Sequence, residues 1–208
     1  MLFSDIQASK VQKVLQEDAS GLVAYESSLQ FDLKLVGLDD SELEACLTLV
    51  EYTSKNHYQA SSMGWSSVKK IEEMEKPDMI FLLVREKTPA AEYSLRNDNN
   101  PVLGYISFMF DFDDPPNDDR EVLYIYEIHL DDHLRGQGLG SRLISFVENV
   151  ARECQIEKTM LTVFTTNKGA KRLYEALGYT KDTCSPEDKV IRTKTIPADY
   201  VIMSKMVG

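Results

Sequence analysis

The sequence predicts a mixed α/β fold built around one sheet, and two features of the chain carry this prediction. Strand-like segments first follow one another as a meander. A strand, a glycine-rich loop, a helix and a further strand then follow between residues 121 and 164. A meander followed by such a βαβ unit favours a mixed sheet over a barrel or a helical bundle. At 208 residues the chain suits a single domain with a sizeable core.

The N-terminal part of the chain is expected to contribute two helices and one strand. Residues 5–17 place four apolar side chains at roughly helical spacing, which predicts a peripheral helix: Ile6, Val11, Val14 and Leu15. Residues 29–36 alternate between apolar and polar side chains as a strand does. An N-cap at Asp40 with a capping-box glutamate then predicts a helix whose apolar face holds Leu43, Cys46, Leu47 and Val50.

The middle of the chain is expected to form three strands. The short apolar run 79–85 predicts a buried strand, and the polar stretch 88–100 predicts a loop. Residues 102–111 and 121–130 are the next strands, separated by the turn sequence FDDPPNDD. Because only this turn separates them, we expect the two strands to form a hairpin.

The C-terminal part is expected to begin with a helix over 139–153, because five apolar side chains form a helical stripe: positions 139, 143, 146, 147 and 150. A strand over 159–164 follows. Residues 168–177 predict a second helix, which Gly178 closes as a left-handed cap before an extended segment begins. The final strand is expected at 200–206.

The composition narrows the class of protein. The net charge of −11 disfavours direct binding to nucleic acid and would steer a cationic partner to the surface, although solubility alone also accounts for it. We find no apolar run of the ~18 residues that a membrane span needs. The N-terminus lacks the pattern of a secretory signal, and three widely spaced cysteines suit reduced thiols in the cytosol or nucleus.

The segment RGQGLG, Arg135 to Gly140, carries the clearest chemical signal. Its three alternate glycines allow close approach to the backbone, and its position at the start of a helix presents successive N–H groups to an anion. A diphosphate suits such a cradle. The spacing differs from the GxGxxG of dinucleotide folds, and no Gly-Lys-Ser/Thr of a P-loop follows.

The stretches YIYEIHLDDHLRGQGLG and MLTVFTTNKGA give the chain its family resemblance. Together they resemble the GNAT acetyltransferases, and more closely the NatD subfamily of N-terminal acetyltransferases, over about residues 24–208. The resemblance implies the GNAT acyl-CoA N-acyltransferase fold, with a central, mixed, mostly antiparallel sheet flanked by helices. It divides the chain into an N-terminal helical segment, 1–20, and the acetyltransferase domain, 21–208. It also implies acetyl-CoA as the acetyl donor.

The resemblance implies the following residues for the cofactor site: His129, Leu130, Asp131, Arg135, Gly136, Gln137, Gly138, Leu139, Gly140, Ser141, Arg142 and Asn167. By analogy with the family, a backbone N–H between residues 128 and 130 would support the acetyl carbonyl where the sheet splays. The three histidines of the chain lack the spacing of metal ligands, and we assign no metal site.

Glu127 is the candidate general base, because it resembles the catalytic glutamate of NatD. An α-amine has a pKa near 7.7 to 8, so a carboxylate acting directly or through one water is a sufficient base. The resemblance adds Tyr126 to the catalytic set and makes Tyr174 a candidate acid, for which a core aromatic is the alternative. Strand alternation puts Tyr126 and Glu127 on opposite faces, so a twist or bulge is needed to bring them together.

The resemblance implies a substrate, the histone tails that begin Ser-Gly-Arg-Gly in histone four and histone two-A. The substrate residues that it implies are Tyr58, Trp65, Leu82, Asp111, Asp113, Tyr124, Tyr126, Thr162 and Tyr200. Asp111 and Asp113 lie two residues apart, on one face of a strand, as a pair for an arginine. Met63 stands where the subfamily has a tryptophan, and the acidic loop is longer.

Two other functions stay open at the level of sequence. A GNAT enzyme acting on lysine or a small polyamine would carry the same glycine loop. A catalytically silent module that binds coenzyme A or histone tails would carry it as well, although the intact Glu127 argues against that. We expect a monomer in the nucleus and cytoplasm that binds neither nucleic acid nor membranes, and association with the ribosome stays open.

Overall fold

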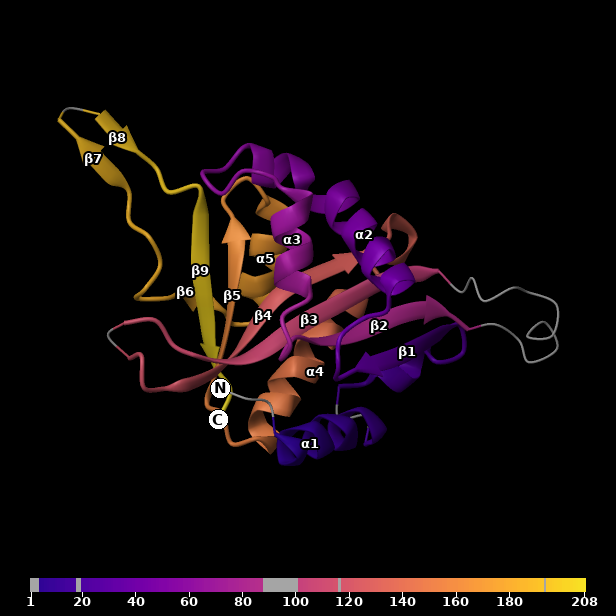
Figure 1. Ribbon diagram of the computed structural model, residues 1–208. Coiled ribbons are helices and arrows are strands. Elements are labelled where there is room, and N and C mark those ends of the chain that lie inside the picture. Colours follow the sequence, from indigo (N-terminus) through magenta and orange to yellow (C-terminus); the bar gives the residue numbers. More distant parts are fainter. Residues whose placement is uncertain (1–3, 18–19, 88–100, 116, 193) are drawn as a thin grey trace.

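The computed structural model describes residues 4–17, 20–87, 101–115, 117–192 and 194–208 (Figure 1). The predicted loop 88–100 lies outside the described residues. The helices are α1 (Asp5–Gln16), η1 (Leu22–Tyr25), α2 (Asp40–Gln59), α3 (Ser67–Met74), η2 (Asp132–Leu134), α4 (Leu139–Glu153) and α5 (Lys168–Ala176). The strands are β1 (Leu29–Lys34), β2 (Ile80–Glu86), β3 (Val102–Phe112), β4 (Glu121–Leu130), β5 (Lys158–Phe164), β6 (Thr180–Lys181), β7 (Lys189–Ile191), β8 (Lys194–Ile196) and β9 (Tyr200–Met206).

Seven strands form one sheet in the order β1-β2-β3-β4-β5-β9-β6. Neighbouring strands are antiparallel except β4 and β5, which are parallel because α4 crosses between them. The mixed, mostly antiparallel sheet is therefore confirmed, as is the β3–β4 hairpin. Strands β7 and β8 pair separately as a small hairpin.

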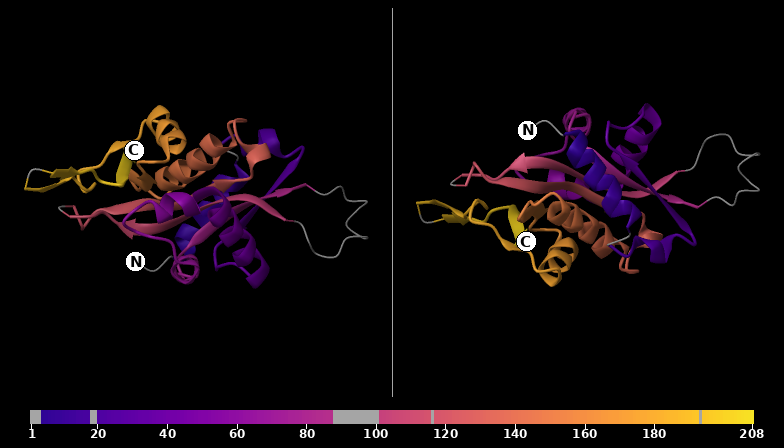
Figure 2. Two further views of the ribbon diagram at one scale, coloured as in Figure 1. Left: turned by 90° about the horizontal axis from the view of Figure 1, so that it is seen from above. Right: turned by 90° about the horizontal axis from the view of Figure 1, so that it is seen from below.

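Helices cover both faces of the sheet (Figure 2). On one face, α4 and α5 pack on a core whose largest side chains include Phe108 and Phe146. On the other face, α2 and α3 cover a second core that includes Cys46, Phe81 and Tyr105. The sheet therefore forms a rigid platform between two layers of helices. The ends of its central strands are available for a site.

The helix starts follow from capping chemistry. Asp39, one residue before the predicted cap at Asp40, caps α2, because its carboxylate accepts from the backbone N–H of Glu42. Glu42 closes the capping box by accepting from the N–H of Asp39. Ser4 and Gln7 form the same motif at the start of α1. The segment chosen for each helix was right, and the α2 cap is corrected by one residue.

Helix α1 packs against α4, and Figure 2 shows the two helices side by side. Val11 and Val14 are buried in the same core as α4, and Lys13 forms an ion pair of 2.9 Å with Glu153. Val11, Val14 and the partly buried Leu15 of the predicted apolar stripe are therefore used for packing, whereas Ile6 at the start of α1 is exposed.

Helix α3 and the β7–β8 hairpin did not follow from the sequence. Helix α3 spans only 8 residues, and the helical spacing of Val68, Ile71 and Met74 covers about two turns, which is too short a pattern to predict a helix by itself. Strands of three residues are below the length at which alternation can be read. Among the described residues, none of the helices is both long and apolar enough to cross a membrane.

Candidate active site

A β-bulge in β4 shapes the centre of the site. Ser107 pairs with Glu127, but the next residue of β3, Phe108, pairs with Ile125, so Tyr126 is the extra residue. The bulge supplies the local change that brings Tyr126 and Glu127 to the lining of one cavity. Strand alternation alone would have kept them on opposite faces.

The two central parallel strands separate just beyond the bulge. Their pairing runs from Leu123 to Ile125 of β4 and includes no later residue of that strand among the described pairs. Two cavities open at this separation, one of about 320 Å³ beside the bulge and one of about 600 Å³ beside the glycine loop. Both are lined by Ser54, Ile128, His129, Asn167, Ala170 and Tyr174. We call them the amine cavity and the loop cavity.

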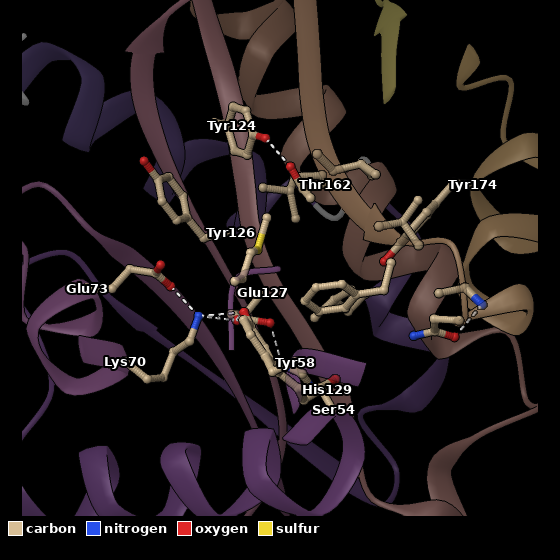
Figure 3. A pocket seen from close by; sticks show the side chains of 18 residues that line it. Ser54, Tyr58, Lys70, Glu73, Tyr124, Tyr126, Glu127, His129, Thr162 and Tyr174 are labelled. Atoms are coloured by element: carbon tan, nitrogen blue, oxygen red, sulfur yellow. Dashed lines mark hydrogen bonds and ion pairs between the residues drawn. The ribbon is translucent and has the colours of Figure 1, made fainter. Parts of the chain in front are cut away.

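Glu127 lies at the centre of a hydrogen-bonded network in the amine cavity (Figure 3). Its Oε1 accepts from the Lys70 ammonium at 2.6 Å and from the Tyr58 hydroxyl at 2.8 Å. Its Oε2 lies 2.6 Å from Nε2 of His129. Lys70 also donates to Glu73 at 2.6 Å. The network joins α2, α3 and β4, and only 9% of Glu127 is exposed.

This network fixes the charges of the amine cavity. Burial opposes ionisation of Glu127, but His129 and Lys70 outweigh it and lower the pKa of Glu127 to about 2. Burial likewise opposes the charge of Lys70, and the Glu127 carboxylate outweighs it, so the pKa of Lys70 is raised. Glu127 is therefore a carboxylate and Lys70 an ammonium at neutral pH.

Tyr174 of α5 lines both cavities and faces the network from the opposite wall (Figure 3). Burial, followed by the charge of Glu127, raises its pKa above the ordinary value for tyrosine. Its hydroxyl therefore stays protonated at neutral pH and is available as a hydrogen-bond donor to a group bound in either cavity. The sequence left a core aromatic and a candidate acid as equal alternatives; Tyr174 packs in the core and also lines both cavities, so its role as an acid stays a prediction.

The glycine loop leads into α4 with two left-handed residues, Gly136 at φ 73° and Gly138 at φ 83°. Gly138 is the N-cap of α4 and, having no side chain, leaves the first-turn N–H groups to a ligand. From the other side, Tyr25 donates to the carbonyl of Gln137 at 2.7 Å. The helix N-terminus and the adjoining loop therefore form a cradle suited to an anion.

The loop cavity gathers most of the cofactor residues implied by sequence: His129, Leu130, Arg135, Gly136, Gly138, Gly140, Ser141 and Asn167. Four others lie outside its lining. Leu139 is buried in the core, because the apolar face of α4 packs there. Asp131 caps η2, Gln137 donates to the carbonyl of His133, and Arg142 extends toward the carbonyl of Ser20.

The amine cavity gathers four of the implied substrate residues, Tyr58, Tyr124, Tyr126 and Thr162, and Met63 at the expected tryptophan position. Two implied residues lie beside it. Trp65 packs edge to face on Tyr58 at 5.4 Å between ring centroids, and Asp111 accepts from the Tyr126 hydroxyl at 3.4 Å. Tyr200 begins β9 and pairs with Phe164.

Two implied substrate residues are corrected. Leu82 is fully buried in the core, because β2 is an interior strand with helices on both faces. Asp113 forms a buried ion pair of 2.7 Å with Lys158, which also pairs with Asp182 at 2.6 Å. Asp113 therefore neutralises a lysine of the protein, and it does not form a pair with Asp111 for an arginine.

Sequence reasoning missed Lys70, which donates to Glu127, and also Glu73 and Thr53, which bind two of the partners of Glu127. Lys70 and Glu73 lie on the short helix α3, and Thr53 lies on α2, where its hydroxyl is 2.6 Å from Nδ1 of His129. The alternate spacing of Glu127 and His129 on one strand was the only signal that could have suggested their contact.

Comparison with known protein families identifies the family to which the chain belongs. The sequence model of the Acetyltransferase (GNAT) family matches residues 54–179, from the end of α2 to the strand after α5. The chain belongs to this family. The match contains the bulged strand, the glycine loop and Tyr174, so the two cavities of the structure lie within the GNAT segment.

Curated relatives of this GNAT chain include acetyltransferases of several names. N-alpha-acetyltransferase 40 of Saccharomyces cerevisiae is 29% identical over 162 residues, which are 71% of this chain and 54% of that protein. Thialysine N-epsilon-acetyltransferase of Bos taurus is 39% identical over 56 residues, which are 27% of this chain and 33% of that protein. The chain spans about half the length of the first of these relatives.

Solved structures show the same fold. Arabidopsis thaliana NAA60 in complex with a bisubstrate analogue has a TM-score of 0.60 at 11% identity, covering 86% of this chain and 100% of that one. The same Arabidopsis protein in complex with acetyl-CoA has a TM-score of 0.56 at 12% identity, covering 85% and 98%. At these identities the likeness establishes the GNAT fold.

Proposed function

We propose that this chain is an N-alpha-acetyltransferase that transfers the acetyl group of acetyl-CoA to the N-terminal α-amine of a basic protein tail. The observation that carries the proposal is the common wall of the two cavities, with Tyr174 and His129 between the glycine loop and Glu127. A donor held at the loop and an amine held at Glu127 would meet at this wall. Holding two reactants in this way supplies a large part of a transfer enzyme's rate.

Acetyl-CoA fits the loop cavity in its chemistry. Its pyrophosphate is an anion for the N-terminus of α4, and its thioester supplies an activated acetyl group. Two residues of the chain then handle the protons of the reaction. Glu127 accepts a hydrogen bond from the substrate amine, orients it and takes the proton that the nitrogen loses on acetylation, and the protonated hydroxyl of Tyr174 would supply a proton to the leaving thiolate.

Gly138→Ala should weaken binding of coenzyme A about tenfold, which corresponds to the roughly 1–2 kcal/mol cost of a left-handed L-residue. The new Cβ would also lie 3.3 Å from the Tyr25 hydroxyl and disturb the cradle. Titration calorimetry with coenzyme A measures this. Gly37→Ala is the matched control, because Gly37 has φ +81° and its Cβ would meet none of the described atoms within 4 Å. Equal affinities of the two variants would contradict the cradle.

Tyr174→Phe should lower kcat about 10²-fold, as expected when one positioned proton donor is removed. The ring and its packing are retained, so the affinity for coenzyme A should stay within about twofold of the wild type. Steady-state kinetics and calorimetry measure the two quantities. Unchanged kcat would assign Tyr174 to core packing alone.

We further propose histone four and histone two-A tails, beginning Ser-Gly-Arg-Gly, as the substrate. The name of the yeast relative supports transfer to an α-amine, and the net charge of −11 and the position of Asp111 beside Tyr126 support a cationic peptide. Because Asp113 is engaged by Lys158, Asp111 is the carboxylate that we assign to the tail's arginine. We expect the enzyme to act as a monomer in the nucleus and cytoplasm.

The substrate is tested by incubating the protein with acetyl-CoA and the peptide Ser-Gly-Arg-Gly-Lys, followed by mass spectrometry of the product. We expect acetylation of the α-amine, and weaker use of a peptide with Ala in place of Arg. A peptide whose α-amine is already blocked and spermidine serve as competing acceptors. Product only on lysine or on spermidine would reject the α-amine and support the other GNAT activity.

A further inference from the structure

His129 is a buried histidine whose two ring nitrogens are both engaged. Nε2 lies 2.6 Å from Oε2 of Glu127, and Nδ1 lies 2.6 Å from the Thr53 hydroxyl. Only 5% of His129 is exposed, yet it lines both cavities. The role of this side chain must therefore be sought in the hydrogen bonds that it makes inside the site.

The Thr53 hydroxyl can either donate a hydrogen bond to Nδ1 of His129 or accept one from it. In the structure it also lies 2.8 Å from the carbonyl of Leu49, one turn earlier in α2. When Nδ1 is unprotonated, Thr53 can donate to it. When Nδ1 carries a proton, Thr53 can accept that proton's hydrogen bond and donate to Leu49, so neither state leaves a buried N–H without an acceptor.

The hydrogen bond from Nε2 of His129 to Glu127 is the same in both protonation states of the ring. A carboxylate only accepts, so Nε2 must carry a proton at 2.6 Å from Oε2. Neutral His129 is then the Nε2–H tautomer with Thr53 donating to Nδ1. Doubly protonated His129 has Thr53 accepting. The ring can gain or lose one proton at Nδ1 without any change in its bond to Glu127.

This proton changes the charge of the amine cavity. Glu127 and Glu73 are balanced there by one ammonium, that of Lys70. With neutral His129 the group carries a net charge of −1, which suits one cationic amine. With doubly protonated His129 the charges cancel, and Glu127 faces two cations that oppose the uptake of a further proton. Arg135 lines the loop cavity and keeps its charge in either state.

The tyrosines around the ring do not change charge near neutral pH. Burial raises the pKa of Tyr58 of α2, Tyr105 of β3 and Tyr174 of α5 above the ordinary value, so all three stay neutral. The Tyr105 ring lies 5.4 Å from the His129 ring. His57 lines the loop cavity as well and lies 2.8 Å from Thr166. Histidine is the side chain that ordinarily titrates between pH 5 and 8.

We propose that His129, through the reversible hydroxyl of Thr53, is a proton switch that controls whether Glu127 can accept the proton of the substrate amine. In the neutral state the proton leaves the substrate nitrogen, an O–H bond forms on Glu127, and water in the cavity then takes the proton. No electrons are transferred. In the doubly protonated state this step is blocked. His129 is a positioning residue, since it acts through Glu127, and the inference rests on the proposed acetyl transfer.

The first test is nuclear magnetic resonance of the ring nitrogens of the wild type, which requires no turnover. The chain has three histidines, so His129→Gln assigns the signals by their loss. We expect Nε2 of His129 to stay protonated from pH 5 to 9 while Nδ1 changes state. An Nδ1 signal that stays constant over this range would overturn the switch, whether or not the protein acetylates the peptide.

The second test compares the pH dependence of kcat/KM below the substrate amine's pKa of about 8. His129→Gln keeps an N–H donor for Glu127 but cannot take a proton. Between pH 7 and 6 its rate should fall by about tenfold, from the amine alone, while that of the wild type falls by more than this. Parallel profiles would overturn the proposal.

Thr53 supplies the matched pair of variants. Thr53→Ser keeps the reversible hydroxyl and should follow the wild-type profile. Thr53→Val keeps the shape but leaves Nδ1 without a partner, which favours the neutral ring because an orphaned N–H costs more than an orphaned lone pair. Its profile should therefore follow His129→Gln. If Thr53 acted only by packing, the order would be reversed, since Ser lacks the methyl group. That result, with both variants folded, rejects the switch.

Discussion

Glu127→Gln is expected to lower kcat about 10²- to 10³-fold at neutral pH, the largest effect on activity of any change at this site. The amide keeps the size of the side chain but removes the negative charge that faces the substrate amine. It also leaves Lys70 with only Glu73 as a counter-charge, so the amine cavity would lose the net negative charge that attracts a cationic amine. Kinetics with the Ser-Gly-Arg-Gly-Lys peptide measure the loss.

Glu148→Gln is the control for this change. Glu148 is also a buried, ion-paired glutamate, bound to Lys205 at 2.8 Å, but it lies on α4 away from both cavities. The control should lose stability and keep its turnover per folded molecule. Glu127→Gln should instead lose its turnover per folded molecule. Equal turnover in the two variants would remove Glu127 from the reaction.

Lys158→Met is expected to destabilise the fold by roughly 3 to 5 kcal/mol, the usual cost of breaking a buried ion pair by removing one partner. Lys158 is 4% exposed and lies between Asp113 at 2.7 Å and Asp182 at 2.6 Å. Methionine fills the volume, but the two carboxylates would then face each other without a counter-charge. Urea unfolding followed by circular dichroism measures the change.

The wild type and Lys158→Met should also differ in how their stability depends on pH. Burial opposes the charge of Asp182, but the hydrogen bonds from Lys158, Ser204 and Cys184 together outweigh it and hold the pKa of Asp182 well below its usual range. A carboxylate whose pKa is lowered in the folded state stabilises the protein above its unfolded pKa, and this contribution is lost as the pH falls. The wild type should therefore lose stability below about pH 4 more steeply than Lys158→Met.

Lys181→Met is the matched control for Lys158→Met. Lys181 pairs with Glu187 at 2.8 Å, but both side chains are largely exposed. An exposed pair is worth less than about 1 kcal/mol, so this variant should unfold close to the wild type. If the two lysine variants unfolded at the same urea concentration, the buried cluster would not be a source of stability.

Local chemistry explains why much of the architecture could be predicted. The apolar stripe of α4 and the capping signals of α1 and α2 act within a few residues of the chain, so they are visible in sequence. The glycine loop is equally local, because its φ values and its place before α4 depend on neighbouring residues. Helix α3 escaped prediction because its apolar pattern covers only about two turns, and a helix this short depends on tertiary packing.

The sequence by itself determined the mixed sheet and the glycine loop, since each rests on patterns within short segments, and its resemblance to the GNAT and NatD enzymes supplied the candidates Glu127 and Tyr174. Only the tertiary structure decided what surrounds them. A bulge at Tyr126 turns Glu127 to the cavity, Lys70 arrives from a helix 57 residues away in sequence, and Asp113 is drawn to Lys158. Charges separated along the chain find their partners only when the folded interior removes water from them, because burial makes each unpaired charge costly.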